Sequence, residues 1–346
     1  MAKHLNKGLK FQHWPGDDRR LFDKLVGSGD IFDAGAWSIL SAVTIRNRRY
    51  AYSQWLGFLA ERLPAVLEMP ATSRVTADNV RLYVEALRRN CTETAIAIAL
   101  QRLHLTLIAM DPEKDWSWLY RLQRRIAKRA KPLQKQHVFS VDLYQVGIQL
   151  MEEAKSKSIL FERVVLSQAE QYRDGLMIAL LSEAPMRRAG FTRLCLGDHV
   201  VKVGERWCIY LQPAMVKTRM AESYEVSKEL SRYIDDYIDT YRCTFPDSDK
   251  HRGMWPYGDR PMTDKMVRRY LRKHTEQRVG CAVSPHGFRR AAATFLATAD
   301  PKNARAAKDL LGHTTFQMTE KHYVVGARSR LAGRALAGIV GAISQP

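Results

Sequence analysis

The sequence predicts a two-domain protein of the α+β class, mainly helical with one small antiparallel sheet. The chain has 346 residues, which is more than most single domains contain. Hydrophobic residues make up 46% of it, enough for substantial cores. Apolar residues recur at helical spacing over most of the chain, whereas residues 199–226 contain short runs typical of strands around a Gly-Glu turn.

The N-terminal part is expected to be an arm followed by a helical domain. Residues 1–34 are polar with scattered glycine and aspartate, which indicates an irregular arm. Helical periodicity continues over residues 35–130, where Thr76 is a candidate N-cap. We expect four helices there, over residues 36–63, 77–89, 94–110 and 116–130. No apolar run reaches the length that spans a membrane, so no membrane is expected as a partner.

Pro132 ends the last of these helices, and residues 131–138 are expected to form a linker to a second domain over residues 139–327. The second domain should hold helices over residues 140–155, 168–182, 228–241, 263–277, 288–299 and 304–311. Its strands are expected over residues 200–203, 207–211 and 224–226. Residues 328–346 then form a tail with a short apolar helix.

The charge of the chain indicates a polyanionic partner. The formal net charge is +19 and the pI is near 9.8, so nucleic acid is the default candidate, although many proteins are basic for solubility alone. Fifteen residues at the end of the first domain contain seven cations and no acid. These cations are Arg121, Arg124, Arg125, Lys128, Arg129, Lys131 and Lys135. They form either a solvated helix face or, as we expect, a segment that contacts phosphates.

Cysteine usage and the N-terminal sequence argue for a cytoplasmic protein without a metal centre. The five cysteines are odd in number and form no Cys-x-x-Cys pair, which indicates reduced thiols and neither a disulfide framework nor a zinc site. The first residues contain no apolar stretch of the kind that directs secretion. Carboxylates with the spacing of metal ligands are not found either, which argues against a metal-dependent nuclease.

A series of side chains near the C-terminus could attack a DNA phosphate. His286 and Arg289 stand three positions apart, His313 follows in a Leu-Gly-His sequence, and Tyr323 ends the series. Cleavage of a phosphodiester without a metal needs cations on the non-bridging oxygens, a nucleophile, a base and an acid. Arginine suits the first task and a tyrosine hydroxyl the second. Each residue alone is a weak signal, because isolated histidines and tyrosines are usually structural.

With these residues in this order, the chain resembles the tyrosine recombinases, the phage lambda integrase family, over residues 139–330. The family pattern begins with an arginine followed at fixed distance by a leucine and an aspartate. Leu194 and Asp198 match that spacing and select Arg187 rather than Arg188. The resemblance implies a catalytic lysine on the following hairpin, where Lys217 fits and Arg219 becomes a DNA contact. The implied catalytic set is Arg187, Lys217, His286, Arg289, His313 and Tyr323.

The resemblance extends more loosely to the helical domain. The sequence from Thr44 to Tyr50 is similar to the opening of the family's SAM-like core-binding domain, and residues 94–103 are similar to its later DNA-facing helix. The two domains are therefore expected to form a C-shaped clamp on double-stranded DNA. The expected DNA contacts are Arg46, Arg48, Arg121, Arg124, Arg125, Lys128, Arg129, Lys131 and Arg219.

The chain departs from the family pattern in three places. Gly190 stands where many members carry an acidic residue that supports the first arginine, so this support must come from elsewhere. Pro185 replaces the usual glycine, and ten positions separate His313 from Tyr323, one more than the commonest spacing. None of these changes removes a catalytic group, so we expect an active enzyme.

The resemblance implies a mechanism and partners. Tyr323 would form a 3′-phosphotyrosyl link and leave a free 5′ hydroxyl, with Arg187 and Arg289 on the phosphate. Recombination would pass through a Holliday junction in a homotetramer, without metal, ATP or another cofactor. The tail over residues 328–346 would either pack on its own domain or dock on a neighbouring protomer.

We expect the integrase of a bacterial mobile element, acting with a directionality factor or a host DNA-bending protein. A type IB topoisomerase and a catalytically silent DNA-binding regulator are the alternatives.

Overall fold

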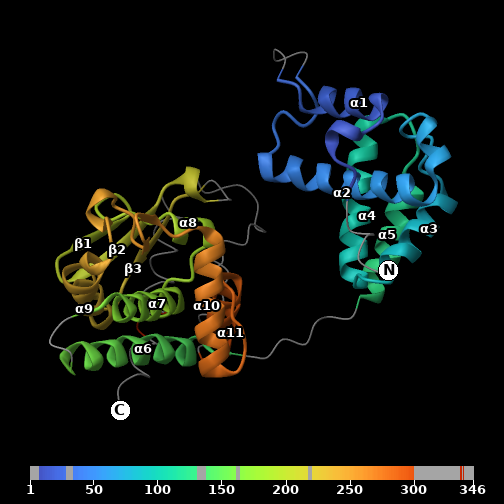
Figure 1. The fold of residues 1–346 in the computed structure, drawn as a ribbon. Helices are drawn as coiled ribbons and strands as arrows, with labels where there is room; N and C mark the ends of the chain where they lie inside the picture. The colour runs from blue at the N-terminus through green and yellow to red at the C-terminus, as the bar shows by residue number, and fades with distance from the viewer. Residues whose placement is uncertain are drawn as a thin grey trace, which may run out of the picture. The chain divides into compact units, whose positions relative to one another are not determined.

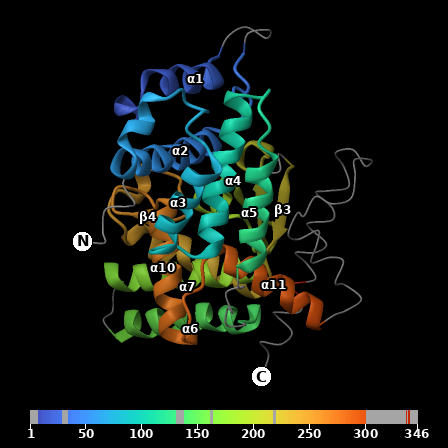
Figure 2. The same ribbon diagram turned by 90° about the vertical axis from the view of Figure 1, so that its right-hand side faces the viewer.

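The computed structural model divides the chain into two compact units, Met1–Gln134 and Lys135–Pro346. It describes residues 8–28, 34–130, 138–160, 164–216 and 220–299, together with Leu336 and Gly338. The division between the units falls inside the segment for which the sequence predicts a linker. Figures 1 and 2 show that the first unit is helical and that the second combines helices with a small sheet.

The described part of the first unit contains five α-helices: α1 (Gly16–Val26), α2 (Ala42–Arg62), α3 (Ala77–Arg88), α4 (Glu93–Met110) and α5 (Ser117–Arg129). Side-chain caps begin three of them. The hydroxyls of Ser41, Thr76 and Thr92 accept hydrogen bonds from backbone N–H groups three residues further on, which satisfies donors that a helix start leaves open. The four helices that the sequence predicts are found, as is the predicted cap at Thr76.

The expectation of an irregular arm over residues 1–34 is wrong for residues 8–28, which fold onto the first unit. Trp14 and Phe22 are buried and contact one another edge to face at 5.4 Å. Trp14 also meets the ring of Tyr52 on α2 at 5.1 Å, and Phe22 meets Trp37 at 5.4 Å. Each aromatic ring buries a large apolar area, so a few rings suffice to hold a segment of mostly polar sequence on the first unit.

A buried ion pair adds a second attachment of α1 to this unit. Asp18 is fully buried and accepts a hydrogen bond from Arg74 Nη1 at 2.6 Å and from the hydroxyl of Tyr52 at 2.7 Å. The Arg74 Nε group donates to the carbonyl of Met69 at 2.7 Å. The three polar side chains therefore satisfy one another in an apolar surrounding.

Helix α4 is the central helix of the first unit. Its buried residues pack into the core of this unit. By length and composition alone it is the one helix among the described residues that could cross a membrane, which differs from the expectation that no apolar run is long enough. This is weak evidence for a membrane span, because a helix packed into a core passes the same test.

The second unit is built around two helices, α6 (Ser140–Leu160) and α7 (Leu166–Glu183). They lie against each other with very little space between their backbones. A Cβ atom on Gly147 of α6 would lie 2.7 Å from the carbonyl oxygen of Gly175 on α7, so only glycine permits this approach. Nearly every residue of α7 is buried, which makes it the centre of the unit.

The remaining elements surround α7. They are α8 (Arg188–Thr192), β1 (Val200–Val203), β2 (Arg206–Leu211), β3 (Glu222–Glu225), α9 (Lys228–Asp236), β4 (Pro256–Tyr257), β5 (Arg260–Pro261), α10 (Asp264–Val279) and α11 (Pro285–Ala299). Strands β1, β2 and β3 form an antiparallel sheet in that order, with Ile209 opposite both Val200 and Tyr224. The predicted strands are thus present, and the third begins two residues earlier than expected.

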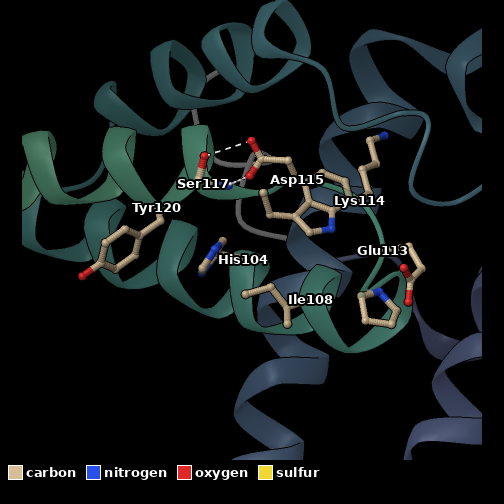
Figure 3. Close-up of a pocket in the computed structure, with 9 residues that line it drawn as sticks. His104, Ile108, Glu113, Lys114, Asp115, Ser117 and Tyr120 are labelled. Carbon is tan, nitrogen blue, oxygen red and sulfur yellow. Dashed lines mark hydrogen bonds between the residues drawn. The ribbon is translucent and has the colours of Figure 1, made fainter.

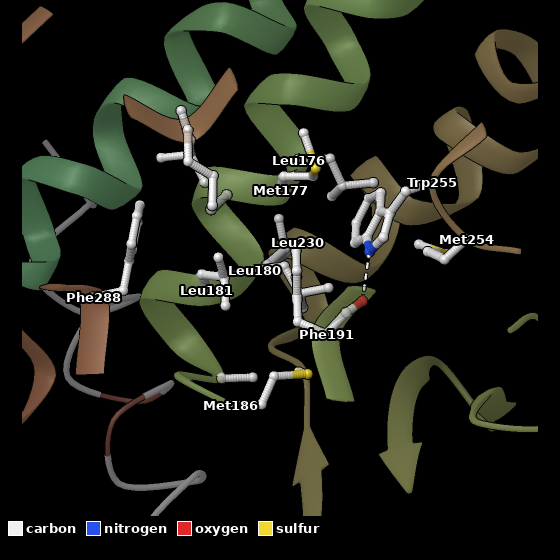
Figure 4. Close-up of a cluster of buried hydrophobic side chains, with 14 of the residues drawn as sticks. Leu176, Met177, Leu180, Leu181, Met186, Phe191, Leu230, Met254, Trp255 and Phe288 are labelled. Atoms are coloured by element: carbon white, nitrogen blue, oxygen red, sulfur yellow. Dashed lines mark hydrogen bonds between the residues drawn. The ribbon is translucent and has the colours of Figure 1, made fainter. Parts of the chain in front are cut away.

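Figure 4 shows the core beside α7, where Leu180 and Leu181 face Phe288 of α11 and Phe191 of α8. Trp255 belongs to this core and donates its indole N–H to the carbonyl of Phe191 at 2.9 Å. The predicted mainly helical fold with a small antiparallel sheet is confirmed. The α8 helix and the short β4–β5 hairpin were not predicted. The predicted helix over residues 304–311 lies outside the described residues, and of the predicted tail helix over residues 328–346 the structure describes Leu336 and Gly338, both helical.

Replacing Asp18 by alanine is expected to destabilise the first unit by about 3–5 kcal/mol, because the cation of Arg74 would remain buried without its partner. The matched control is Arg81→Ala, which removes an exposed pair with Asp78 at 3.8 Å and should cost about 0–1 kcal/mol. Urea denaturation followed by tryptophan fluorescence measures both losses. Equal losses for the two variants would contradict the role assigned to Asp18.

Candidate active site and nucleic-acid interface

The turn after α7 presents Arg187 at the edge of the core. Met186 beside it is fully buried, and Arg187 is the N-cap residue of α8 with an extended backbone. The side chain of Arg187 is 24% exposed and forms an ion pair with Glu222 of β3. The ion pair with Glu222 thus holds this guanidinium in a partly buried place beside β3.

The second predicted arginine comes from α11 and reaches the same turn. Arg289 is only 6% exposed and its Nη1 group donates to the carbonyl of Pro185 at 2.5 Å. Burial lowers the pKa of Arg289, and the nearby cation of Arg187 adds to this shift, whereas Tyr224 and Glu222 oppose it. The structure therefore brings together two arginines that are about a hundred residues apart in the sequence.

Strand β3 supplies a carboxylate and a hydroxyl to this cluster. Glu222 and Tyr224 are two residues apart, so their side chains lie on the same face of the strand. The hydroxyl of Tyr224 donates to Glu222 Oε2 at 2.9 Å. Burial, followed by the charge of Glu222, raises the pKa of Tyr224, so that this hydroxyl remains protonated. Neither residue was predicted from the sequence, although Gly190 indicated that an acid had to come from another element.

His286 lies one helical turn before Arg289 on α11, and its side chain is exposed. Residues three apart on a helix share a face, so His286 and Arg289 are directed to the same side of α11. Three predicted catalytic residues, Lys217, His313 and Tyr323, lie outside the described residues, as do the predicted DNA contacts Lys131 and Arg219.

A second carboxylate anchors the strand that supports the arginines. Glu183, the last residue of α7, is buried and accepts hydrogen bonds from Ser227 N at 3.0 Å and from Ser227 Oγ at 2.6 Å. Ser227 also caps α9 by accepting from the N–H of Leu230. Burial raises the pKa of Glu183 to about 7, although the bonds from Ser227 oppose the shift. The end of α7 is thereby tied to the residues that follow β3.

The sequence pattern of the phage integrase family matches residues 148–329, more than half of the chain. The chain belongs to the phage integrase family. A search of curated proteins found no match. The matched segment is the catalytic domain of tyrosine recombinases, so the activity of this family member is tyrosine-mediated, site-specific DNA recombination.

The helical unit of the recombinase carries one strongly basic helix face. The buried side of α5 is formed by Leu119, Gln123 and Ile126. Its predicted DNA contacts are all exposed, namely Arg121, Arg124, Arg125, Lys128 and Arg129. On α2, Arg46 is exposed, whereas the guanidinium of Arg48 lies 4.8 Å above the ring of Trp37. The guanidinium of Arg48 therefore makes a cation–π contact within the unit.

A second basic helix face lies in the catalytic unit of the recombinase. Helix α10 has its apolar side in the core and six exposed cations on the other sides; Arg278 pairs with Glu153, and the other five lie within residues 265–273. These are Lys265, Arg268, Arg269, Arg272 and Lys273. This helix was predicted from the sequence, but its basic face was not. Residues 265–273 carry the same signal as α5, a run of cations without an acid.

A depression of about 540 Å³ lies between α4 and α5, and Figure 3 shows the side chains that line it. His104 and Tyr120 face each other across it, with ring centroids 5.7 Å apart. Lys114 lies 4.7 Å above the ring of Trp116, and Asp115 accepts from the N–H and the hydroxyl of Ser117. The depression contains none of the predicted catalytic residues. Among the described residues, no group of His, Cys, Asp or Glu could hold a metal ion.

The buried carboxyl of Glu183 is expected to make the stability of the catalytic unit fall as the pH rises. This carboxyl ionises near pH 4.5 in an unfolded chain but near pH 7 in the folded one, so between these values the folded state binds more protons. This contribution is therefore lost as the pH rises through that window. In Glu183→Gln, which is neutral at every pH, the melting temperature should fall less between pH 5 and pH 8 than in the wild type.

Glu205→Gln is the matched control, because Glu205 is exposed and paired with Lys228. It should keep the wild-type pH profile. A Glu183→Gln profile that is parallel to the wild-type profile would show that burial does not shift this carboxyl.

Proposed function

We propose that the chain is the integrase of a bacterial mobile element, acting in the cytoplasm on specific double-stranded DNA sites. The observation that carries the catalytic assignment is the convergence of Arg187 and Arg289 at one turn. Two cations that are held close together in a partly buried place are costly in isolation and favourable around an anion. A phosphate of DNA is the anion that the family's activity supplies.

In this proposal Tyr323 attacks the scissile phosphorus and forms a 3′-phosphotyrosyl bond, while the bond to the 5′ oxygen breaks. Arg187 and Arg289 bind the non-bridging oxygens, and His313 donates a further hydrogen bond to one of them. His286 accepts the proton of the tyrosine hydroxyl, and Lys217 gives a proton to the departing 5′ oxygen. No metal, ATP or other cofactor takes part in these steps.

We further propose that the two units form a C-shaped clamp on the duplex and that four protomers assemble on two sites. Each unit carries one exposed basic helix face, on α5 and on α10, which supports phosphate contact by both units. Strands are exchanged through a Holliday junction. Leu336 of the tail over residues 328–346 is buried in the core of its own unit, which supports packing of the tail on its own domain rather than docking on a neighbouring protomer. A directionality factor or a host DNA-bending protein assists the reaction.

Covalent trapping tests the nucleophile. The protein is incubated with nicked duplexes tiled across the DNA beside its own gene, and SDS is added to reveal a shifted protein band. The wild type should form the band, Tyr323→Phe should form none, and Arg187→Ala should form it roughly 10²-fold more slowly. Tyr120→Phe, which changes an exposed tyrosine in the first unit, is the control and should behave as the wild type. A band that persists in Tyr323→Phe would overturn the assignment.

Salt titration of DNA affinity tests the basic face of α5. Because each cation that neutralises a phosphate releases counterions, replacing Arg124 by glutamine should reduce the slope of log K against log salt by about 0.9. Arg20→Gln removes an exposed cation of α1 that is paired with Asp17 and should leave the slope unchanged. An unchanged slope for Arg124→Gln would mean that α5 faces away from the duplex.

A further inference from the structure

Helix α8 offers no acidic side chain to support the arginine at its start. The residue three positions after Arg187 is Gly190, and a Cβ atom there would lie 2.9 Å from Leu211 Cδ1. The end of β2 therefore packs directly on α8, and any side chain at position 190 would require Leu211 to move. An acid at position 190 would therefore disturb the packing of Leu211, and α8 in this chain has no acidic residue.

The same packing brings a different carboxylate to the arginine. Leu211 is paired with Glu222 across the β2–β3 ladder, so the close approach of β2 to α8 also places Glu222 beside that helix. The carboxylate of Glu222 is 11% exposed, pairs with Arg187 and accepts the hydroxyl of Tyr224. Tyr224 in turn forms a hydrogen bond with Arg289. One strand thus contacts both arginines.

We propose that Glu222 is a positioning residue of the recombinase, which replaces a carboxylate of α8 and, together with Tyr224, fixes the guanidinium groups of Arg187 and Arg289 for the phosphate. This inference rests on the proposed function, in which the two arginines bind the non-bridging oxygens. A guanidinium has five N–H donors in a rigid fork, so a carboxylate can orient it without exhausting its capacity for a phosphate.

Glutamine at position 222 separates charge from shape. Glu222→Gln keeps an oxygen that can accept from Tyr224 but loses the ion pair with Arg187. Glu225→Gln is the matched control, since Glu225 lies on the same strand and pairs with Arg206 at 3.0 Å. We expect Glu222→Gln to bind duplex DNA within about twofold of the wild type and to form the covalent complex about 10²-fold more slowly, because a displaced cation loses its alignment with the phosphate. Glu225→Gln should match the wild type in both.

A substrate with a neutral scissile group distinguishes positioning from general support of the fold. A methylphosphonate at the scissile position lacks one charged oxygen and therefore depends less on aligned arginines. The deficit of Glu222→Gln relative to the wild type should shrink on this substrate. A deficit of the same size on both substrates would make Glu222 merely structural and would overturn the proposal, as would wild-type rates for Glu222→Gln on ordinary DNA.

Arg187→Ala, assayed in parallel, separates the inference from the function on which it rests. If this variant or Tyr323→Phe cleaved like the wild type, the assigned site would be wrong and the role of Glu222 would fall with it. If both lost activity while Glu222→Gln kept it, only the positioning role would be refuted.

Discussion

The burial of α7 is the constraint on which the candidate site depends. Because this helix packs against α6 through Gly147 and Gly175, its last turn is held inside the unit rather than at its surface. The chain leaves it at Glu183 and must turn within four residues to reach Arg187. The two ends of that turn are bonded to Ser227 and Glu222, and its middle is bonded to Arg289. The turn is therefore fixed by elements that are distant in the sequence.

Electrostatics explain why this turn needs so many partners. Two guanidinium groups in a partly buried place repel one another. Burial lowers the pKa of Arg289, and the charge of Arg187 lowers it further. Glu222 offsets part of the repulsion when no DNA is present, and the hydroxyl of Tyr224 adds a neutral partner. A phosphate that enters would complete the neutralisation. In the proposed function, these contacts hold the two guanidinium groups in place before the phosphate arrives, which is the condition under which fixed charges contribute most to catalysis.

The sequence could predict what depends on local patterns. The cap at Thr76, the strands around the Gly204 turn and the helix that carries Arg289 follow from spacing and residue type. The predicted helix began only at residue 288, whereas α11 begins at Pro285 and therefore also carries His286. The sequence could not predict the fold of residues 8–28, because their attachment depends on tertiary contacts with Tyr52 and Arg74. The sequence could also not predict which residue pairs with Arg187. That partner is set by the register of β2 and β3 and by the missing side chain at position 190, neither of which any local motif records.

Exposure separates the two kinds of cation in this protein. The cations of α5 and α10 are exposed and therefore solvated, so their attraction for phosphates is long in range, summed over many groups and screened by salt. Arg289 is almost fully buried and Arg187 partly so, which weakens the screening and makes their effect depend on geometry. Loss of a cation from the first set should weaken binding in a graded way. Loss of alignment in the second set should leave binding nearly intact and slow the chemical step, which is why a carboxylate that adds no affinity for DNA can still be important in the site.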